Sequence, residues 1–108
     1  MSPPATASPP TFPDDILAFA AEKDLAKYLI PVYEMTRRVY PTSRRITPVL
    51  EYDPEIAGLR WIVFEVEIGG MTTEQYVDLH WQWSGELFKV GPATHVMWFG
   101  LHEDIKDA

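Results

Sequence analysis

The chain has 108 residues, of which 46% are hydrophobic, and its formal net charge is −7. This length suits a single domain, and the acidic balance opposes non-specific attraction to the phosphates of nucleic acids. The absence of cysteine excludes disulfides, thiolate catalysis and cysteine-ligated zinc or iron–sulfur sites. The sequence shows neither a secretory leader nor a run of about 18 apolar residues, so we expect a cytoplasmic protein without a membrane partner.

The first thirteen residues differ in composition from the rest of the chain. Residues 1–13 contain five of the ten prolines together with Ser, Thr and Ala, a composition that is typical of poorly ordered segments. We therefore predict a disordered, Pro-rich tail over 1–13, a single α+β domain over 14–102 and a polar C-terminal tail over 103–108.

A helical pattern begins at Asp14 and extends to Pro41, which ends it. Its apolar stripe follows helical spacing through Leu25, Leu29, Val32, Thr36 and Val39. Pro31 interrupts this region because it has no N–H and its ring clashes with the preceding turn. Two alternatives stay open: one helix kinks near 27–29, or a second helix begins with Pro31 in its first turn. The unbroken stripe favours the kink.

Two strands follow, over 45–52 and 59–68, and a turn-rich connection predicts that they form an antiparallel hairpin. Pro48 cannot donate a backbone hydrogen bond, so it favours an edge position or an outward-facing N–H. In the second strand, one face carries four apolar side chains, which we expect in the core: Ile62, Phe64, Val66 and Ile68. The opposite face carries Trp61, Val63, Glu65 and Glu67.

The second helix begins with a capping box, in which Thr72 and Gln75 each accept a hydrogen bond from the backbone N–H of the other. It runs to about Phe88, before Gly91-Pro92. Two apolar stripes lie about 100° apart on it. The first comprises Tyr76, Leu79, Trp83, Leu87 and Val90, and the second comprises Val77, Trp81 and Phe88. We expect the first stripe on the sheet and the second against the long first helix.

A third strand is predicted over 94–101 (THVMWFGL). The element order is then helix, strand, strand, helix, strand, which predicts an α+β fold with a three-stranded, mainly antiparallel sheet and two helices on one face. Placing the third strand beside the first and antiparallel to it gives the spatial order 2-1-3. Pro48 fits poorly in the central strand of that order.

The uncovered face of this sheet is the main candidate interface. Exposed apolar surface of this extent usually marks an interaction site. The candidate interface residues are Trp61, Val63, Glu65, Glu67, Val49, Glu51 and Trp98. The glutamates also permit paired carboxylate chemistry, since Glu65 and Glu67 lie about 7 Å apart on one side of a strand, but a solvated sheet face produces the same alternation.

A cluster of arginines follows the first helical region. Arg37, Arg38, Arg44 and Arg45 are four of the nine basic residues. Two interpretations are open. Either these residues complement the negative end of the helix dipole and lie in a solvated connection, or they form an anion-binding patch.

No nucleophile elbow, phosphate-binding glycine motif or metal-ligand spacing is present. We therefore expect no catalytic residues, metal or cofactor, and we infer a non-enzymatic interaction protein that forms a homodimer or masks another, possibly basic, protein through its open sheet face. Nucleic acid is an unlikely partner for so acidic a chain. The alternative is a small-ligand-binding or enzymatic domain, in which an aromatic pocket is served by Glu51, Glu65, Glu67 or His80.

Overall fold

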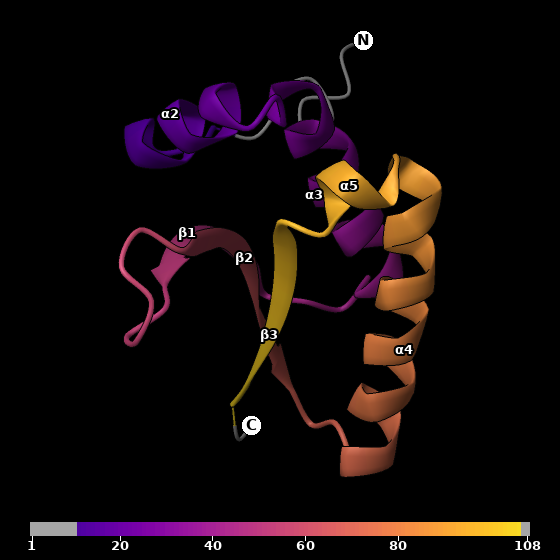
Figure 1. Cartoon of the computed structure of the whole chain (residues 1–108). Helices are drawn as coiled ribbons and strands as arrows, with labels where there is room; N and C mark the ends of the chain where they lie inside the picture. Colours follow the sequence, from indigo (N-terminus) through magenta and orange to yellow (C-terminus); the bar gives the residue numbers. More distant parts are fainter. Residues whose placement is uncertain (1–10, 107–108) are drawn as a thin grey trace, which may run out of the picture.

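The computed structural model describes residues 11–106 (Figure 1). The helices and strands, in chain order, are α2 (Asp14–Glu22), α3 (Ala26–Val39), β1 (Arg45–Tyr52), β2 (Arg60–Gly69), α4 (Thr73–Val90), α5 (Ala93–Val96) and β3 (Phe99–Lys106). Most of the predicted tail over 1–13 lies outside the described residues. Of its last three residues, Phe12 packs edge-on against Tyr33, with ring centroids 6.5 Å apart.

The fold is α+β, as predicted, but the sheet is mixed rather than mainly antiparallel. Its strand order is β1-β2-β3, with β1 antiparallel and β3 parallel to β2. The predicted order 2-1-3 is therefore wrong. β2 lies in the centre because it has buried apolar side chains on both faces, such as Val63 and Phe64, and because α4 returns the chain for a parallel strand directly beside it.

This order also resolves the position of Pro48. β1 pairs only with β2, so it is an edge strand, and Pro48 stands opposite Phe64 in the register. An edge strand tolerates the missing N–H of proline, whereas a central strand needs it for a ladder. The sequence prediction of an edge position is correct, and the central placement of this strand was the error.

The first helical region is divided at Asp24 and not at Pro31. The N–H of Leu25 donates to the carbonyl of Ala20 at 2.7 Å, and the N–H of Asp24 donates to Ala21 at 3.4 Å. These two bonds form a Schellman motif, whose left-handed residue is Asp24 with φ of 60°. Pro31 is the sixth residue of α3. Neither alternative from the sequence is therefore correct, since the break precedes the proline by several residues.

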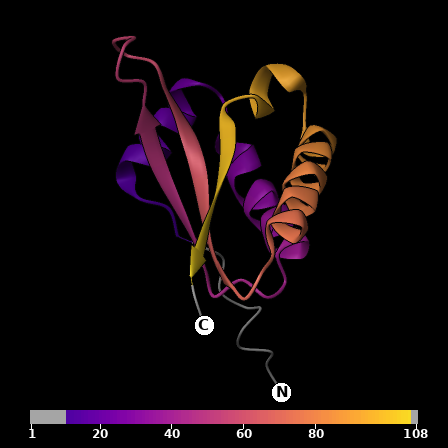
Figure 2. The same ribbon diagram turned by 90° about the horizontal axis from the view of Figure 1, so that it is seen from below.

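The helices of the described residues pack into one core on one face of the sheet, where Figure 2 shows α3 and α4 side by side. The predicted stripe of α2 and α3 is buried, from Leu25 to Val39, and all four predicted core residues of β2 are fully buried with it. Ile16 and Phe19 bring α2 into the same core. Val63 is buried but does not belong to this core, because its side chain lies on the opposite face of β2.

α4 has the predicted capping box, with Gln75 N to Thr72 Oγ1 at 3.2 Å and Thr72 N to Gln75 Oε1 at 2.9 Å. Its first apolar stripe packs inward, where Trp83 and Leu87 are buried. Its second stripe does not contact the long first helix as predicted. Val77, Trp81 and Phe88 are exposed by 41%, 73% and 58%, because α3 and the sheet both pack against one side of α4.

The end of the chain departs most from the prediction. Residues 93–96 form the short helix α5, and β3 begins only at Phe99. The N–H groups of His95 and Val96 both donate to the carbonyl of Pro92 at 2.9 Å, which starts the helical turn, and Val96 is fully buried. Four residues of the predicted polar tail, 103–106, belong to β3, so the domain extends beyond 102.

Candidate functional site

The face of the sheet opposite the helices, called the open face below, carries most of the predicted interface residues. Residues that stand opposite each other in neighbouring strands project to the same side of a sheet. The open face therefore comprises the positions Arg45, Thr47, Val49 and Glu51 of β1, Trp61, Val63, Glu65, Glu67 and Gly69 of β2, and Gly100, His102, Asp104 and Lys106 of β3.

The apolar end of the open face is a compact group around Val63. Val49 and Gly100 flank Val63 in the register, and Val63 is only 4% exposed. A Cβ atom on Gly100 would lie 3.6 Å from Val63 Cγ2 and 3.8 Å from Trp61 Cδ1. The indole of Trp61 therefore lies close to Gly100 of β3, beside the space that a side chain at position 100 would occupy.

This group is smaller than the apolar patch expected from the sequence. The expected interface included Trp98 of the third strand, but β3 begins after it, and the register turns Phe99 and Leu101 to the helix side, where both pack with the core. Gly100 takes the outward position instead. The remaining apolar surface of the open face is centred on Trp61.

The other end of the open face is charged. Glu67 stands between Arg45 and Asp104, and Glu65 stands between Thr47 and His102. Glu51 lies at the opposite end, beside Trp61. Three carboxylates on two neighbouring strands, Glu65, Glu67 and Asp104, thus share one region of the sheet.

The three glutamates of the open face do not converge with His102. The register brings His102 beside Glu65 but leaves Glu51 two rows away. Across residues 11–106, no three His, Asp or Glu side chains are arranged to hold a metal ion.

Trp98 is the one interface candidate that does not lie on the open face. It precedes β3, and its ring packs edge-on against Phe19 of α2, with the centroids 5.8 Å apart. Lys23 Nζ lies 4.8 Å from the centre of the Trp98 ring. Trp98 therefore anchors α2 to the start of β3.

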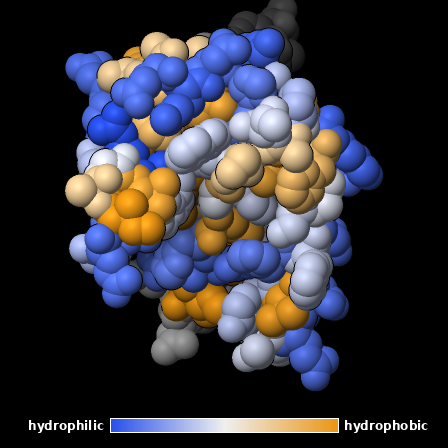
Figure 3. Space-filling model, viewed as in Figure 1, coloured by the Kyte–Doolittle hydropathy of each residue, from blue (hydrophilic) through white to orange (hydrophobic). Residues whose placement is uncertain are grey.

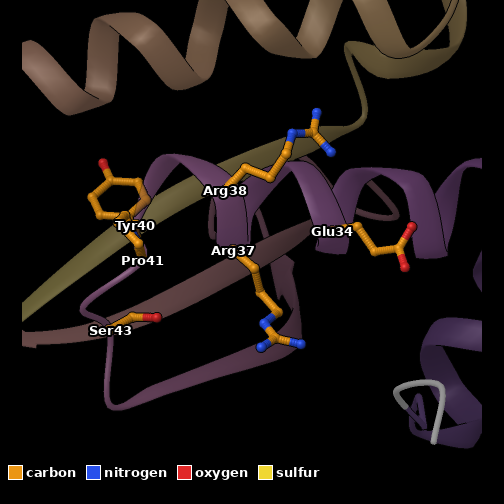
Figure 4. A pocket seen from close by; sticks show the side chains of 6 residues that line it. All are labelled: Glu34, Arg37, Arg38, Tyr40, Pro41 and Ser43. Carbon is orange, nitrogen blue, oxygen red and sulfur yellow. The ribbon is translucent and has the colours of Figure 1, made fainter. Parts of the chain in front are cut away.

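Arg37 and Arg38 do not share one patch with Arg45. Arg37 and Arg38 line an open pocket of about 420 Å³ at the end of α3, together with Glu34, Tyr40, Pro41 and Ser43. Figure 4 shows the two guanidinium groups pointing to different sides of the helix. Arg45 lies on the open face beside Glu67. Arg38 also faces α4. The hydrogen bond from Lys89 is the main cause that lowers the pKa of the Glu86 carboxyl, and the positive charge of Arg38 adds a smaller contribution.

A hydrogen-bonded group that the sequence did not indicate lies between the helices and β3. Glu103 is nearly buried, with 8% of its side chain exposed, and it lies on the helix side of β3 opposite Val66. The hydroxyl of Tyr40 donates to Glu103 Oε2 at 2.7 Å, and His80 Nδ1 lies 3.1 Å from the same oxygen. His80 therefore shares the carboxylate of Glu103 with Tyr40, on the other side of the sheet from Glu51, Glu65 and Glu67.

The signal for this group was present but weak. Phe99, Leu101 and Ile105 alternate as in a strand, and Glu103 occupies the remaining inward position. A carboxylate at a core position is uncommon without a partner, and both of its partners come from distant parts of the chain. For this reason the sequence alone predicts a polar tail for the segment that contains Glu103.

None of the helices within the described part of the chain is both long and apolar enough to cross a lipid bilayer. Comparisons with protein-family models, with curated proteins and with solved structures find no match.

Proposed function

We propose that the protein is a non-enzymatic interaction protein whose open face binds a basic segment of another protein. One observation carries this proposal: Glu65, Glu67 and Asp104 lie together at one end of a sheet face that no described helix covers, and the half-buried ring of Trp61 lies at the other end of the same face. Protein-binding surfaces commonly combine an aromatic anchor with a polar rim.

The charge of this surface selects the partner. The open face carries four acidic residues, Glu51, Glu65, Glu67 and Asp104, and two basic register positions, Arg45 and Lys106. The whole chain carries the same sign, with 16 acidic and 9 basic residues. A lysine- or arginine-rich segment is therefore attracted both at long range and at the surface itself.

The same charges argue against a second copy on this face. Stacking two open faces would bring their carboxylates together, and like charges placed across an interface cost several kcal/mol. A basic partner instead places its cations over Glu65 and Glu67 and its apolar atoms against Trp61.

The test is binding of a fluorescein-labelled oligolysine peptide, measured by fluorescence anisotropy. Glu65→Lys/Glu67→Lys is compared with Glu34→Lys/Glu55→Lys, which has the same net charge but changes exposed sites away from the open face. We expect the first variant to bind at least tenfold more weakly than the second, a difference of about 1.4 kcal/mol. Equal loss in both variants would show that only net charge matters and would overturn the proposal.

A second variant separates the aromatic anchor from the charges. Trp61→Ala keeps every carboxylate, so we expect weaker binding that still falls with added salt, because salt screens the remaining ion pairs. The carboxylate variant should lose most of that salt dependence. If Trp61→Ala binds the peptide like the wild type, the partner contacts the carboxylates alone and Trp61 is not part of the interface.

A further inference from the structure

α4 carries an exposed apolar stripe that does not belong to the open face. Val77, Trp81 and Phe88 are exposed by 41%, 73% and 58%, although each has a large apolar side chain. Together with the half-exposed Ser84 they form a row with spacings of four, three and four residues, called the α4 stripe below. This spacing is that of the contact positions in paired helices.

The α4 stripe lies on the side of the helix turned away from α3. Trp83 and Leu87 occupy the buried side of α4, and none of the described residues covers the stripe. In Figure 3, apolar side chains appear along the α4 side of the molecule among hydrophilic ones. A row of exposed aromatic residues along one helix is a feature of association surfaces.

We propose that the α4 stripe binds a second copy of this chain through antiparallel pairing of the two α4 helices about a two-fold axis. The four-three-four spacing reads the same in both directions, as a two-fold contact requires. The two-fold axis passes α4 midway between Gln82 and Trp83. Val77 then contacts Phe88 of the partner, and Trp81 contacts Ser84 of the partner. The largest side chain of the stripe is thereby placed against its smallest.

Gly85 supports this arrangement. A Cβ atom built at Gly85 would have no neighbour within 4 Å, so glycine at this helical position is not required by packing within one copy. Glycine is unfavourable inside a helix relative to alanine. In the antiparallel pair, Gly85 lies next to Ser84 and leaves room for the indole of the partner's Trp81.

Charge complementarity selects a second copy as the occupant. Glu74, Asp78 and Lys89 lie on the same flank of the stripe at the helical spacing of α4. A two-fold axis of this kind brings equivalent flanks together, and it places Lys89 between Glu74 and Asp78 of the partner. The Lys89 side chain is 74% exposed, and its ion-pair partner within the chain is Glu86 at 2.8 Å, so it can turn to the partner at little cost.

The contact is small. The stripe spans eleven helical steps, about 16 Å, so the helix pair covers less than the roughly 800 Å² per partner of a standard protein interface. We therefore expect a reversible dimer whose population rises over micromolar concentrations.

The first test measures the mass of the full chain by sedimentation equilibrium between 1 and 500 µM, concentrations chosen to bracket the micromolar range. We expect the wild type to approach twice the monomer mass, and Trp81→Lys to remain a monomer at every concentration. Ile56→Lys is the matched control, because Ile56 is also exposed, by 56%, but lies in the β1–β2 connection. A monomeric wild type, or a dimer that Trp81→Lys leaves intact, would overturn the proposal.

The second test determines the orientation of the helices. Since the chain has no cysteine, single-cysteine variants report one contact each. A mixture of Val77→Cys and Phe88→Cys should form a disulfide-linked dimer under mild oxidation, whereas Val77→Cys alone should not, because its two copies lie eleven residues apart along the pair. Efficient linkage of Val77→Cys with itself would indicate parallel helices and contradict the two-fold arrangement.

A charge exchange tests the flank. Lys89→Glu should raise the dissociation constant at least tenfold, and the added changes Glu74→Lys and Asp78→Lys should restore it. Failure of the triple variant to recover dimerisation, with helical content unchanged by circular dichroism, would exclude the pairing of Lys89 with these carboxylates.

Discussion

The hydroxyl of Tyr40 donates a 2.7 Å hydrogen bond to Oε2 of Glu103, across 63 residues of the chain. This bond joins the residue that ends α3 to the middle of β3, and His80 of α4 approaches the same carboxylate. Three elements that are distant in sequence are thereby connected at one nearly buried charge. Hydrogen bonds to a charged group stabilise a fold more than neutral ones do.

Replacing Tyr40 with Phe should destabilise the protein by about 1.5–3 kcal/mol, because the substitution keeps the buried ring but removes a hydrogen bond to a carboxylate. The measurement is the free energy of unfolding from urea denaturation at pH 7. Tyr52→Phe is the control, since Tyr52 is 60% exposed, and it should change stability by less than about 0.5 kcal/mol. Equal effects of the two substitutions would contradict the role of the Tyr40–Glu103 bond.

Stability should also depend on pH through Tyr40. Burial, and then the hydrogen bond to Glu103 and its negative charge, raise the pKa of the Tyr40 phenol above its ordinary value. The unfolded chain releases this proton near pH 10 while the folded chain retains it, so the contribution is fully present below about pH 10. Above that pH the unfolded state binds fewer protons, and the free energy of unfolding falls by up to about 1.4 kcal/mol per pH unit from this group.

The difference in unfolding free energy between the wild type and Tyr40→Phe isolates this effect from the other titrating groups. We expect the advantage of the wild type over the variant to be constant up to about pH 9 and to fall steadily from about pH 10 to about pH 11, above the ordinary tyrosine pKa of about 10. A difference that stays constant over this range would show that the phenol titrates alike in both states.

Thr36→Val should cost about 1–3 kcal/mol although the two side chains have nearly the same shape. The Thr36 hydroxyl is fully buried, donates to the carbonyl of Val32 at 2.8 Å and accepts from Nε1 of Trp83 at 2.8 Å. Valine would leave the indole N–H of Trp83 without an acceptor, which carries the full cost of its desolvation. Urea denaturation measures the change, with Thr42→Val in the exposed turn as the control; no loss in Thr36→Val would refute this account.

Two glycine-to-alanine substitutions should have opposite effects on stability. At Gly100 the new methyl group would lie 3.6 Å from Val63, an ordinary contact, so reduced freedom of the unfolded chain should stabilise the protein by about 0.4–1 kcal/mol. At Gly91 the methyl would lie 2.5 Å from Cε1 of Tyr28. The Tyr28 ring must then move, and overpacking of this kind typically costs about 1–3 kcal/mol. Melting temperatures that shift in the same direction would contradict the packing described at one of the two sites.

Features that depend on near neighbours in the chain could be predicted from the sequence. The capping box of Thr72 and Gln75 needs only residues three positions apart, and the inward row of β2 from Ile62 to Ile68 follows from strict alternation. Both are present in the structure. Pro48 also indicated its edge position, because the absence of a backbone donor is a property of the residue itself.

Features that depend on the choice between distant partners could not be predicted. The sequence contains apolar residues on both faces of β2, but only the assembled sheet shows that β1 and β3 flank it. The burial of Glu103 depends on Tyr40 and His80, and the burial of Thr36 depends on Trp83. In each case the free energy of burying a polar group is offset by a partner that local pattern does not reveal.

The sequence by itself determined an acidic, cysteine-free α+β domain, the capped start of α4 and the alternation that separates the two faces of β2. The tertiary structure alone decided that β3 begins at Phe99, that Trp98 packs on α2 and that Val77, Trp81 and Phe88 remain exposed. The physical reason is that helix caps and strand alternation arise from interactions over a few residues, whereas the exposure of an apolar side chain depends on which other elements occupy the space around it. The α4 stripe is apolar in the sequence in the same way as the buried stripe beside it, and only the packing of α3 and the sheet against one side of α4 distinguishes the two.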